Sequence, residues 1–251
     1  MEIRLVRHAT LAVRFSGVTV LVDPMLGDVG ANPPVPNSPN PRPNPLVPLP
    51  RPAPALIGGV NAVLITHTHR DHFDDAAASI VPKHLPLICQ PEDEAKFQGL
   101  GFASVRPVTG VLEWEGIEIH RTGGRHGVGE VGRRMAPVSG FVLRASRERT
   151  LYVAGDTIWC PEVEEALRRH APAVTVVNAG AAQFLEGGPI TMAAEDVIEV
   201  ARRAPGTNVI AVHMEAINHC VLTRAALASS VAAAGLSDRV WIPRDGESKS
   251  F

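Results

Sequence analysis

Short apolar runs separated by turn residues dominate the first part of the chain. Residues 2–6 and 11–22 have the pattern of strands, with Ser16-Gly17 as the turn of a hairpin. The same criterion predicts further strands near residues 62–66, 86–89, 105–107, 117–121, 139–145, 150–154, 173–177 and 208–212.

Helical patterns become frequent only in the second half. Runs rich in Ala, Glu and Arg predict helices over residues 74–80, 91–98, 161–170, 191–203 and 222–234. Thr191 and Thr223 stand near the start of two of them and are candidate N-caps. The first half is therefore strand-rich and the second alternates strand with helix. A core of two sheets with helices outside satisfies this order of elements.

A proline-rich segment, residues 32–54, interrupts the strand pattern. Because proline lacks the backbone N–H that a sheet ladder needs, this segment is predicted to be a loop. Both flanks are strand-like runs that can pair within one sheet system. We therefore favour a loop lying over its own domain, and a single domain spanning residues 1–251, over a linker or a partner-binding proline tract.

Composition excludes several classes of protein. The formal net charge of −2 argues against capture of nucleic acid by bulk attraction, so no nucleic-acid partner is expected. The three cysteines form no CxxC pair, which favours reduced thiols and a cytoplasmic location. No apolar run is long enough to span a membrane, and no membrane association is expected. The oligomeric state stays open, and a homo-oligomer is compatible with the sequence.

A dense cluster of potential metal ligands directly follows the apolar strand of residues 62–66. His67, His69, Asp71 and His72 place three imidazoles and a carboxylate within six residues. Neutral imidazoles suit zinc, iron or manganese, and a carboxylate allows a second, harder ion beside the first. A loop that is histidine-rich by chance is the alternative, but the H-x-H-x-D-H spacing is more demanding than most short motifs.

The segment His67-Thr68-His69-Arg70-Asp71-His72 resembles the signature of the metallo-β-lactamase superfamily. That resemblance implies an α+β fold: a four-layer αββα sandwich with two mixed sheets and helices on their outer faces. It also implies three later ligands, for which the candidates are His126 in Gly124-Arg125-His126-Gly127, Asp156 after Gly155, and His213 after Val212. Taken alone, His126 could be a turn residue, Asp156 a helix cap and His213 a core histidine.

By the same resemblance, two divalent metal ions would be bound, with zinc expected and manganese or iron as alternatives. His67, His69 and His126 would hold one ion, Asp71, His72 and His213 the other, and Asp156 would bridge them. The diiron branch of the superfamily has Glu where this chain has His69, so hydrolysis is favoured over redox chemistry. Asp71 and His213 are the residues expected to act in catalysis, Asp71 by orienting the attacking water or accepting its proton.

The resemblance narrows further, to the branch that contains ascorbate-6-phosphate lactonase. It rests on Val6-Arg7-His8-Ala9-Thr10, on Leu21-Val22-Asp23-Pro24 and on Asn44-Pro45-Leu46. The context of His213 departs from that branch, so only a small ester- or lactone-like substrate is expected, with a phosphodiesterase as the alternative. The low aromatic content and the lack of a basic arm disfavour a nuclease.

Several residues around the predicted centre have open roles. Glu215 and His219 are candidate proton donors or outer partners of a ligand, and His8 and Asn178 are weaker candidates of the same kind. Asp23 is interpreted as the end of a strand. Arginines near His126 could bind an anionic substrate, although a solvated loop is the commoner role of such a run; they are Arg121, Arg125, Arg133 and Arg134.

Overall fold

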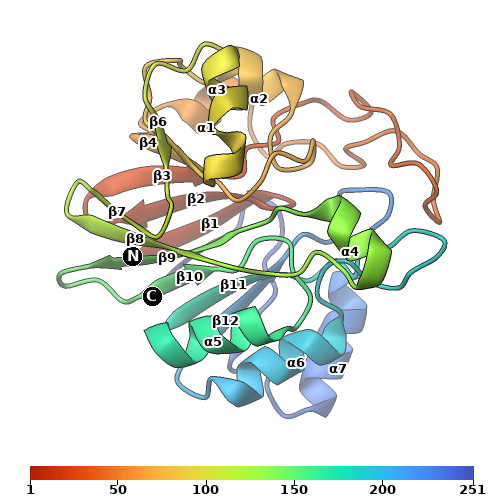
Figure 1. Ribbon diagram of the computed structural model, residues 1–251. Coiled ribbons are helices and arrows are strands. Elements are labelled where there is room, and N and C mark those ends of the chain that lie inside the picture. Colours follow the sequence, from red (N-terminus) through yellow and green to blue (C-terminus); the bar gives the residue numbers. More distant parts are fainter.

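A computed structural model describes residues 1–251 and contains two seven-stranded sheets packed face to face (Figure 1). The first sheet has the spatial order β14 (Ser248–Ser250), β1 (Glu2–Arg7), β2 (Thr10–Phe15), β3 (Val18–Val22), β4 (Ala62–Ile65), β5 (Leu87–Cys89) and β6 (Val105–Pro107). The second has the order β13 (Val240–Trp241), β12 (Asn208–Val212), β11 (Val174–Asn178), β10 (Leu151–Val153), β9 (Gly140–Ala145), β8 (Ile117–Thr122) and β7 (Val111–Trp114).

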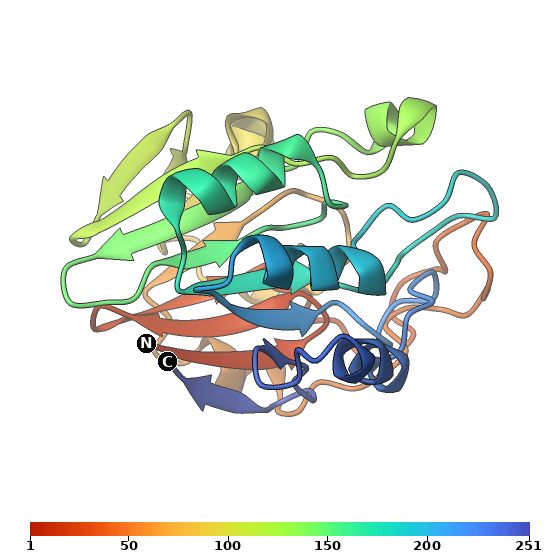
Figure 2. The same ribbon diagram turned by 90° about the horizontal axis from the view of Figure 1, so that it is seen from below.

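Helices cover the outer face of each sheet. The first sheet is covered by α1 (Ala53–Ile57), α2 (Asp75–Ile80), the short 3-10 helix η1 (Pro91–Asp93) and α3 (Glu94–Gly99). The second is covered by α5 (Pro161–His170), α6 (Ala194–Arg203) and α7 (Arg224–Ala233), while α4 (Gly129–Met135) lies at one end of the sandwich (Figures 1 and 2). The four-layer αββα arrangement expected from the sequence is confirmed. None of these helices combines the length and the apolar character that crossing a membrane requires.

Three apolar clusters hold the layers together. The largest lies between the sheets and includes Leu5, Phe15, Leu64, Phe141 and Val176, all with less than 2% of their surface exposed. Each fully buried Leu or Phe stabilises this layer by about 1.5–3 kcal/mol, because its side chain is removed from water. The other two clusters lie under the helices of each face. The sheets are thus apolar on both faces, and polar groups gather at their edges.

The directions of the strands determine which edge of the sheets is suited to a functional site. In the first sheet β1, β3 and β4 run in the same direction, because β2 is antiparallel to both β1 and β3 and β3 is parallel to β4. In the second sheet β8, β10, β11 and β12 likewise share one direction. The carboxyl ends of these seven strands therefore lie at a common edge within each sheet, which is where α/β proteins usually bind ligands.

Most predicted elements are present within two or three residues of the expected bounds, and α5 and β12 match them. The short elements α1, α4, β7, β13 and β14 were not predicted. One cap is confirmed, because the Thr223 hydroxyl accepts a hydrogen bond from Ala226 N–H. The other was wrong: α6 begins only at Ala194, and the Thr191 hydroxyl accepts from Ala182 N–H instead.

The proline-rich loop folds back over its own sheets, as predicted, at the end of the sandwich where α4 lies (Figure 2). It is shorter than expected, because Ala53 already belongs to α1. One buried side chain organises it: Asn218, 2% exposed, accepts hydrogen bonds from Val35 N–H and the Asn44 amide and donates to Ser38 and to the Asn40 carbonyl. Hydrogen bonds of the Asn218 side-chain amide therefore stabilise the turns of this loop.

Removal of the Asn218 amide should loosen the proline-rich loop without unfolding the sheets. We expect Asn218→Ala to lower the free energy of unfolding by about 1–3 kcal/mol, since several buried polar groups lose their partner. Limited proteolysis should then cut residues 34–44 faster than in the wild type. The matched control is Asn61→Ala, which removes one exposed bond to Thr19 N–H and should change stability by less than about 0.5 kcal/mol. Equal cutting rates in both variants would contradict the role given to Asn218.

Candidate metal centre

The predicted ligands come from the carboxyl ends of strands in both sheets. His67 to His72 follow β4, whereas His126, Asp156 and His213 follow β8, β10 and β12. The structure brings all seven predicted residues together at the common edge. Five of them are at most 2% exposed: His67, His72, His126, Asp156 and His213.

Nitrogen and oxygen atoms of these side chains form three overlapping groups. Within each group, all the ligand-type atoms lie within 4.8 Å of one another. The groups are His67 with His69 and His126, His67 with His72 and Asp156, and His8 with Asp71, His72 and His213. Apart from His8, the first and third groups are the two sets that the sequence predicted.

Asp156 lies between the two sets. Its Oδ2 atom is 3.2 Å from His72 Nε2 and 3.4 Å from His126 Nε2, and its Oδ1 atom is 3.3 Å from His213 Nε2. The Asn178 amide donates a 2.7 Å hydrogen bond to Oδ1 and so fixes the carboxylate. A carboxylate that reaches both sets is what a bridging ligand requires.

A chain of hydrogen bonds starting at Asp23 fixes how two of the imidazoles face the centre. Thr66 donates its hydroxyl proton to Asp23 Oδ2 at 2.7 Å, so at 3.1 Å its oxygen must accept from His67 Nδ1. His72 Nδ1 donates to the same carboxylate at 2.8 Å. Because each neutral ring carries one proton, the Nε2 atoms of His67 and His72 turn bare lone pairs toward the centre.

Two further imidazoles have outer partners. His126 Nδ1 donates to the Ile190 carbonyl at 2.7 Å, which leaves its Nε2 as an acceptor. His213 Nδ1 lies 3.6 Å from the Cys220 sulfur. Outer partners of this kind orient metal-binding histidines and set their tautomer.

Hydrogen-bond acceptor atoms therefore face one another at the centre. The Nε2 atoms of His72 and His213 are buried and have no hydrogen-bond partner. Burial disfavours a charge on either ring, yet the Asp156 carboxylate raises the pKa of His213 to about 10, and Asp156 with Asp23 and Asp71 holds the pKa of His72 well above its usual value. A cation is strongly favoured at this point, and the residues present fit divalent metal ions.

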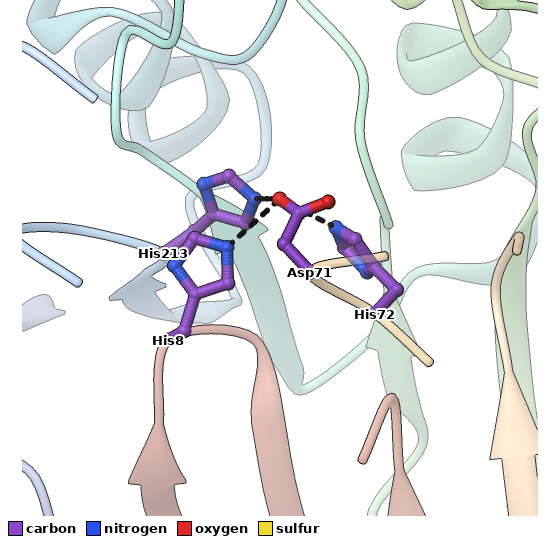
Figure 3. Close-up of side chains that lie close together, drawn as sticks. All are labelled: His8, Asp71, His72 and His213. Atoms are coloured by element: carbon purple, nitrogen blue, oxygen red, sulfur yellow. Dashed lines mark hydrogen bonds and ion pairs between the residues drawn. The ribbon is translucent and has the colours of Figure 1, made fainter. Parts of the chain in front are cut away.

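Asp71 and His8 complete the third group, as Figure 3 shows. Asp71 Oδ2 lies 3.1 Å from His8 Nε2 and 3.4 Å from His213 Nε2. The His8 ring packs on the His213 ring with centroids 3.6 Å apart, and no part of its surface is exposed. His8 follows β1 with a φ of 60°, a left-handed conformation that turns its side chain into the centre. Its position after a strand, in Arg7-His8-Ala9-Thr10, was the sequence signal for this role.

Two of the sequence interpretations were wrong. Asp23 does more than end β3, because its carboxylate binds Thr66 and His72 behind the metal centre. Glu215 is directed away from it and forms an ion pair with Arg224 at 2.6 Å.

The arginines near His126 are mostly neutralised by neighbours. Arg121 donates two hydrogen bonds to Glu92, and Arg125 pairs with Glu162 at 3.0 Å. Arg133 and Arg134 lie on α4, and Arg134 lines the outer end of the site. This argues against the arginine cluster that an anionic substrate would need.

A cavity of about 390 Å³ opens onto the centre. Half of the residues that line it are apolar or proline: Met25, Pro33, Pro34, Val35, Pro36, Met135, Phe184 and Ile217. It continues outward into a second cavity of about 710 Å³ between the proline-rich loop, α4 and residues 184–186. The proline-rich loop is thus a wall of the site, and its apolar face is turned toward any bound substrate.

Comparison with known proteins agrees with this geometry. Residues 19–214 match the family model described as "Beta-lactamase superfamily domain". The chain is 39% identical over 258 residues to UPF0173 protein YddR of Bacillus subtilis (strain 168), with the whole of both chains covered. It is 25% identical over 265 residues to a UPF0173 metal-dependent hydrolase of Azorhizobium caulinodans, covering 99% of each.

A solved structure is similar over its full length. The isothiocyanate hydrolase from Delia radicum gut bacteria superposes with a TM-score of 0.95 at 36% identity, covering 100% of this chain and 99% of that one. The Azorhizobium relative and the solved structure are both named as hydrolases, and the solved structure has the same fold. The chain belongs to the metallo-β-lactamase superfamily and, within it, to the UPF0173 group of metal-dependent hydrolases.

Proposed function

We propose that the centre holds two divalent cations. His67, His69 and His126 would bind one and Asp71, His72 and His213 the other, with Asp156 between them. The observation that carries this proposal is the cluster of ligand-type atoms within 4.8 Å of one another, in which the buried Nε2 atoms of His72 and His213 have no hydrogen-bond partner. An imidazole-rich set favours zinc, with manganese or iron as alternatives.

When bound, such a pair of cations supplies a hydroxide nucleophile at neutral pH and polarises the substrate. Asp71 contributes a carboxylate that borders the cavity. Burial opposes its charge, but His72, His213 and His8 hold its pKa well below the usual range, so it stays an acceptor for the proton of the attacking water. The hydrogen bond from His8 orients that carboxylate, and the apolar walls exclude bulk water.

We propose a small, weakly polar substrate with an electrophilic carbon, of the isothiocyanate class. The apolar half of the cavity lining and the similarity to an isothiocyanate hydrolase support this choice. The reaction is R–N=C=S + H₂O → R–NH₂ + COS. A C–O bond forms at the central carbon, the C–N bond breaks, and the nitrogen takes up both hydrogens of the water.

A small ester or lactone, the class expected from the sequence, has an electrophilic carbon of the same kind and remains the alternative within this mechanism. A phosphodiester is less suited to the site. The cavity beyond the proposed cations is half apolar, and Arg70 is its only arginine for a charged diester.

Metal removal gives the first test. Dialysis against a chelator should abolish hydrolysis, and zinc should restore it. Asp156→Ala should reduce the metal content from about two ions per chain to one or fewer, because both sets lose a shared ligand. Elemental analysis measures the content, with Asp238→Ala on the surface as the matched control. Full metal content in Asp156→Ala would rule out the bridging role.

The hydrogen bond from Asp23 to His72 gives the second test. Asp23→Ala should weaken metal binding by roughly 10–100-fold, since a metal-binding histidine loses the partner that orients it. Competition with a fluorescent zinc chelator reports the affinity directly. Asp28→Ala changes an exposed carboxylate close by in sequence and should leave it unchanged. If both variants bind zinc with the affinity of the wild type, Asp23 has no role in orienting His72 for metal binding.

A substrate panel gives the third test. Metal-loaded protein should hydrolyse benzyl isothiocyanate with a kcat/KM at least about tenfold above those for phenyl acetate, a γ-lactone and bis-p-nitrophenyl phosphate, a difference of about 1.4 kcal/mol in transition-state binding. Amine release and COS formation should be equimolar. Preferred turnover of the phosphodiester would overturn the substrate class while leaving the metal centre intact.

A further inference from the structure

The polar residues of the inner cavity are almost all committed to other partners. His69, Asp71, His126 and Asp156 are metal-ligand candidates. Among the remaining four, Asn44 binds Asn218, and Arg70 lies 3.5 Å from Asn32 and 3.8 Å from Asp75. The fourth is His219, and its side chain has no hydrogen bond to any protein group.

The environment of His219 is unusual for a histidine of a protein core. It is 5% exposed, and its Nδ1 atom is fully buried without a partner. A buried polar atom that lacks a partner costs about 1–3 kcal/mol, so such groups normally find one. His219 is also absent from every group of atoms close enough to share a metal ion. The ring borders the cavity beyond the proposed metal ligands, and because Nδ1 is buried, Nε2 is the nitrogen left free for a molecule that enters it.

The backbone around His219 holds the ring in place. The His219 carbonyl accepts a 3.0 Å hydrogen bond from Gln183 N–H. The Phe184 ring lies beside the imidazole, with centroids 6.3 Å apart. The preceding residue, Asn218, is the anchor of the proline-rich loop. A polar group fixed between an apolar wall and the metal centre is suited to orienting a substrate.

We propose that His219 is a substrate-binding residue whose imidazole N–H donates a hydrogen bond to the leaving heteroatom of the substrate, the nitrogen of N=C=S. This inference rests on the proposed hydrolysis, and it identifies the group that would orient the scissile bond. Phe184 and Met135, which line both cavities, would hold the apolar substituent on that nitrogen.

The protonation state of His219 agrees with this role. Burial lowers its pKa to about 4, so at pH 7 the ring is neutral and has one N–H to donate. As negative charge develops on the nitrogen during C–N cleavage, that hydrogen bond strengthens. The donor therefore stabilises the transition state more than the ground state, and its loss should affect kcat more than KM.

Three variants test the proposal. His219→Ala and His219→Phe remove the donor, while His219→Gln keeps an N–H in a side chain of similar reach. We expect the first two to lower kcat/KM for benzyl isothiocyanate by about tenfold or more, mainly through kcat, and His219→Gln to stay within about threefold of the wild type. Zinc content should equal that of the wild type in all three. His84→Ala, at an exposed histidine far along the chain, is the control.

Binding provides a readout that does not depend on turnover. Calorimetry with benzyl azide, which keeps a cumulated group and an acceptor lone pair on the nitrogen that carries the benzyl substituent but is stable to water, should give an affinity about threefold weaker for His219→Ala than for the wild type. The affinity of His219→Gln should lie close to that of the wild type.

The failures can be told apart. If the wild type hydrolyses none of the panel, the proposed substrate class fails, and the azide affinities alone decide the role of His219. Loss of zinc from His219→Ala would make His219 a ligand and overturn the proposal. Unchanged kcat/KM and affinity in His219→Ala, equal losses in His219→Gln and His219→Ala, or no azide binding by the wild type would each overturn it.

Discussion

A buried cluster of imidazoles and carboxylates that requires a cation is the constraint around which this molecule is organised. Asp156 lies within 3.4 Å of three Nε2 atoms, and the outer hydrogen bonds of His72 and His126 commit their protons to the opposite side of each ring. Most of these groups are buried, and solvent reaches the centre only through the cavity that opens onto it. The fold can hold them together because rigid strand ends from two sheets set their positions, while the apolar layer between the sheets stabilises the whole.

The sequence predicted best what depends on neighbours along the chain. The His67–His72 cluster is compact, so its chemistry was evident from spacing alone, and α5 and β12 carry strong local patterns. Strands of two or three residues, such as β13 and β14, have too few positions to show a period.

Contacts between distant segments were not predictable in the same way. Asp23 meets His72 across 49 positions of sequence, and nothing near Asp23 indicates that partner. Glu215 is only two residues from His213, yet a left-handed backbone directs it to Arg224. Of the two candidates that the sequence offered near His213, only His219, six positions from it, borders the cavity.

The residues proposed to activate water are different from those that form the apolar walls of the substrate cavity. In the proposed mechanism, histidines and aspartates at the strand ends set the reactivity, and a hydroxide formed there would attack an isothiocyanate or an ester carbon alike. Discrimination rests with the walls: the prolines of residues 33–36, α4 and the segment around Phe184. These walls are loops and a short helix, which can vary while the sheet edges stay fixed.

Residues 213–220 belong both to the proposed metal centre and to the walls of the cavity. Within eight positions they carry a proposed metal ligand, the anchor of the proline-rich wall and the histidine that borders the cavity. An insertion or deletion there would displace all three at once. Evolutionary change of specificity is therefore channelled toward wall residues outside this segment, such as Met135 and Phe184, which can be exchanged one at a time, and directed evolution of this scaffold would find its tolerant positions there.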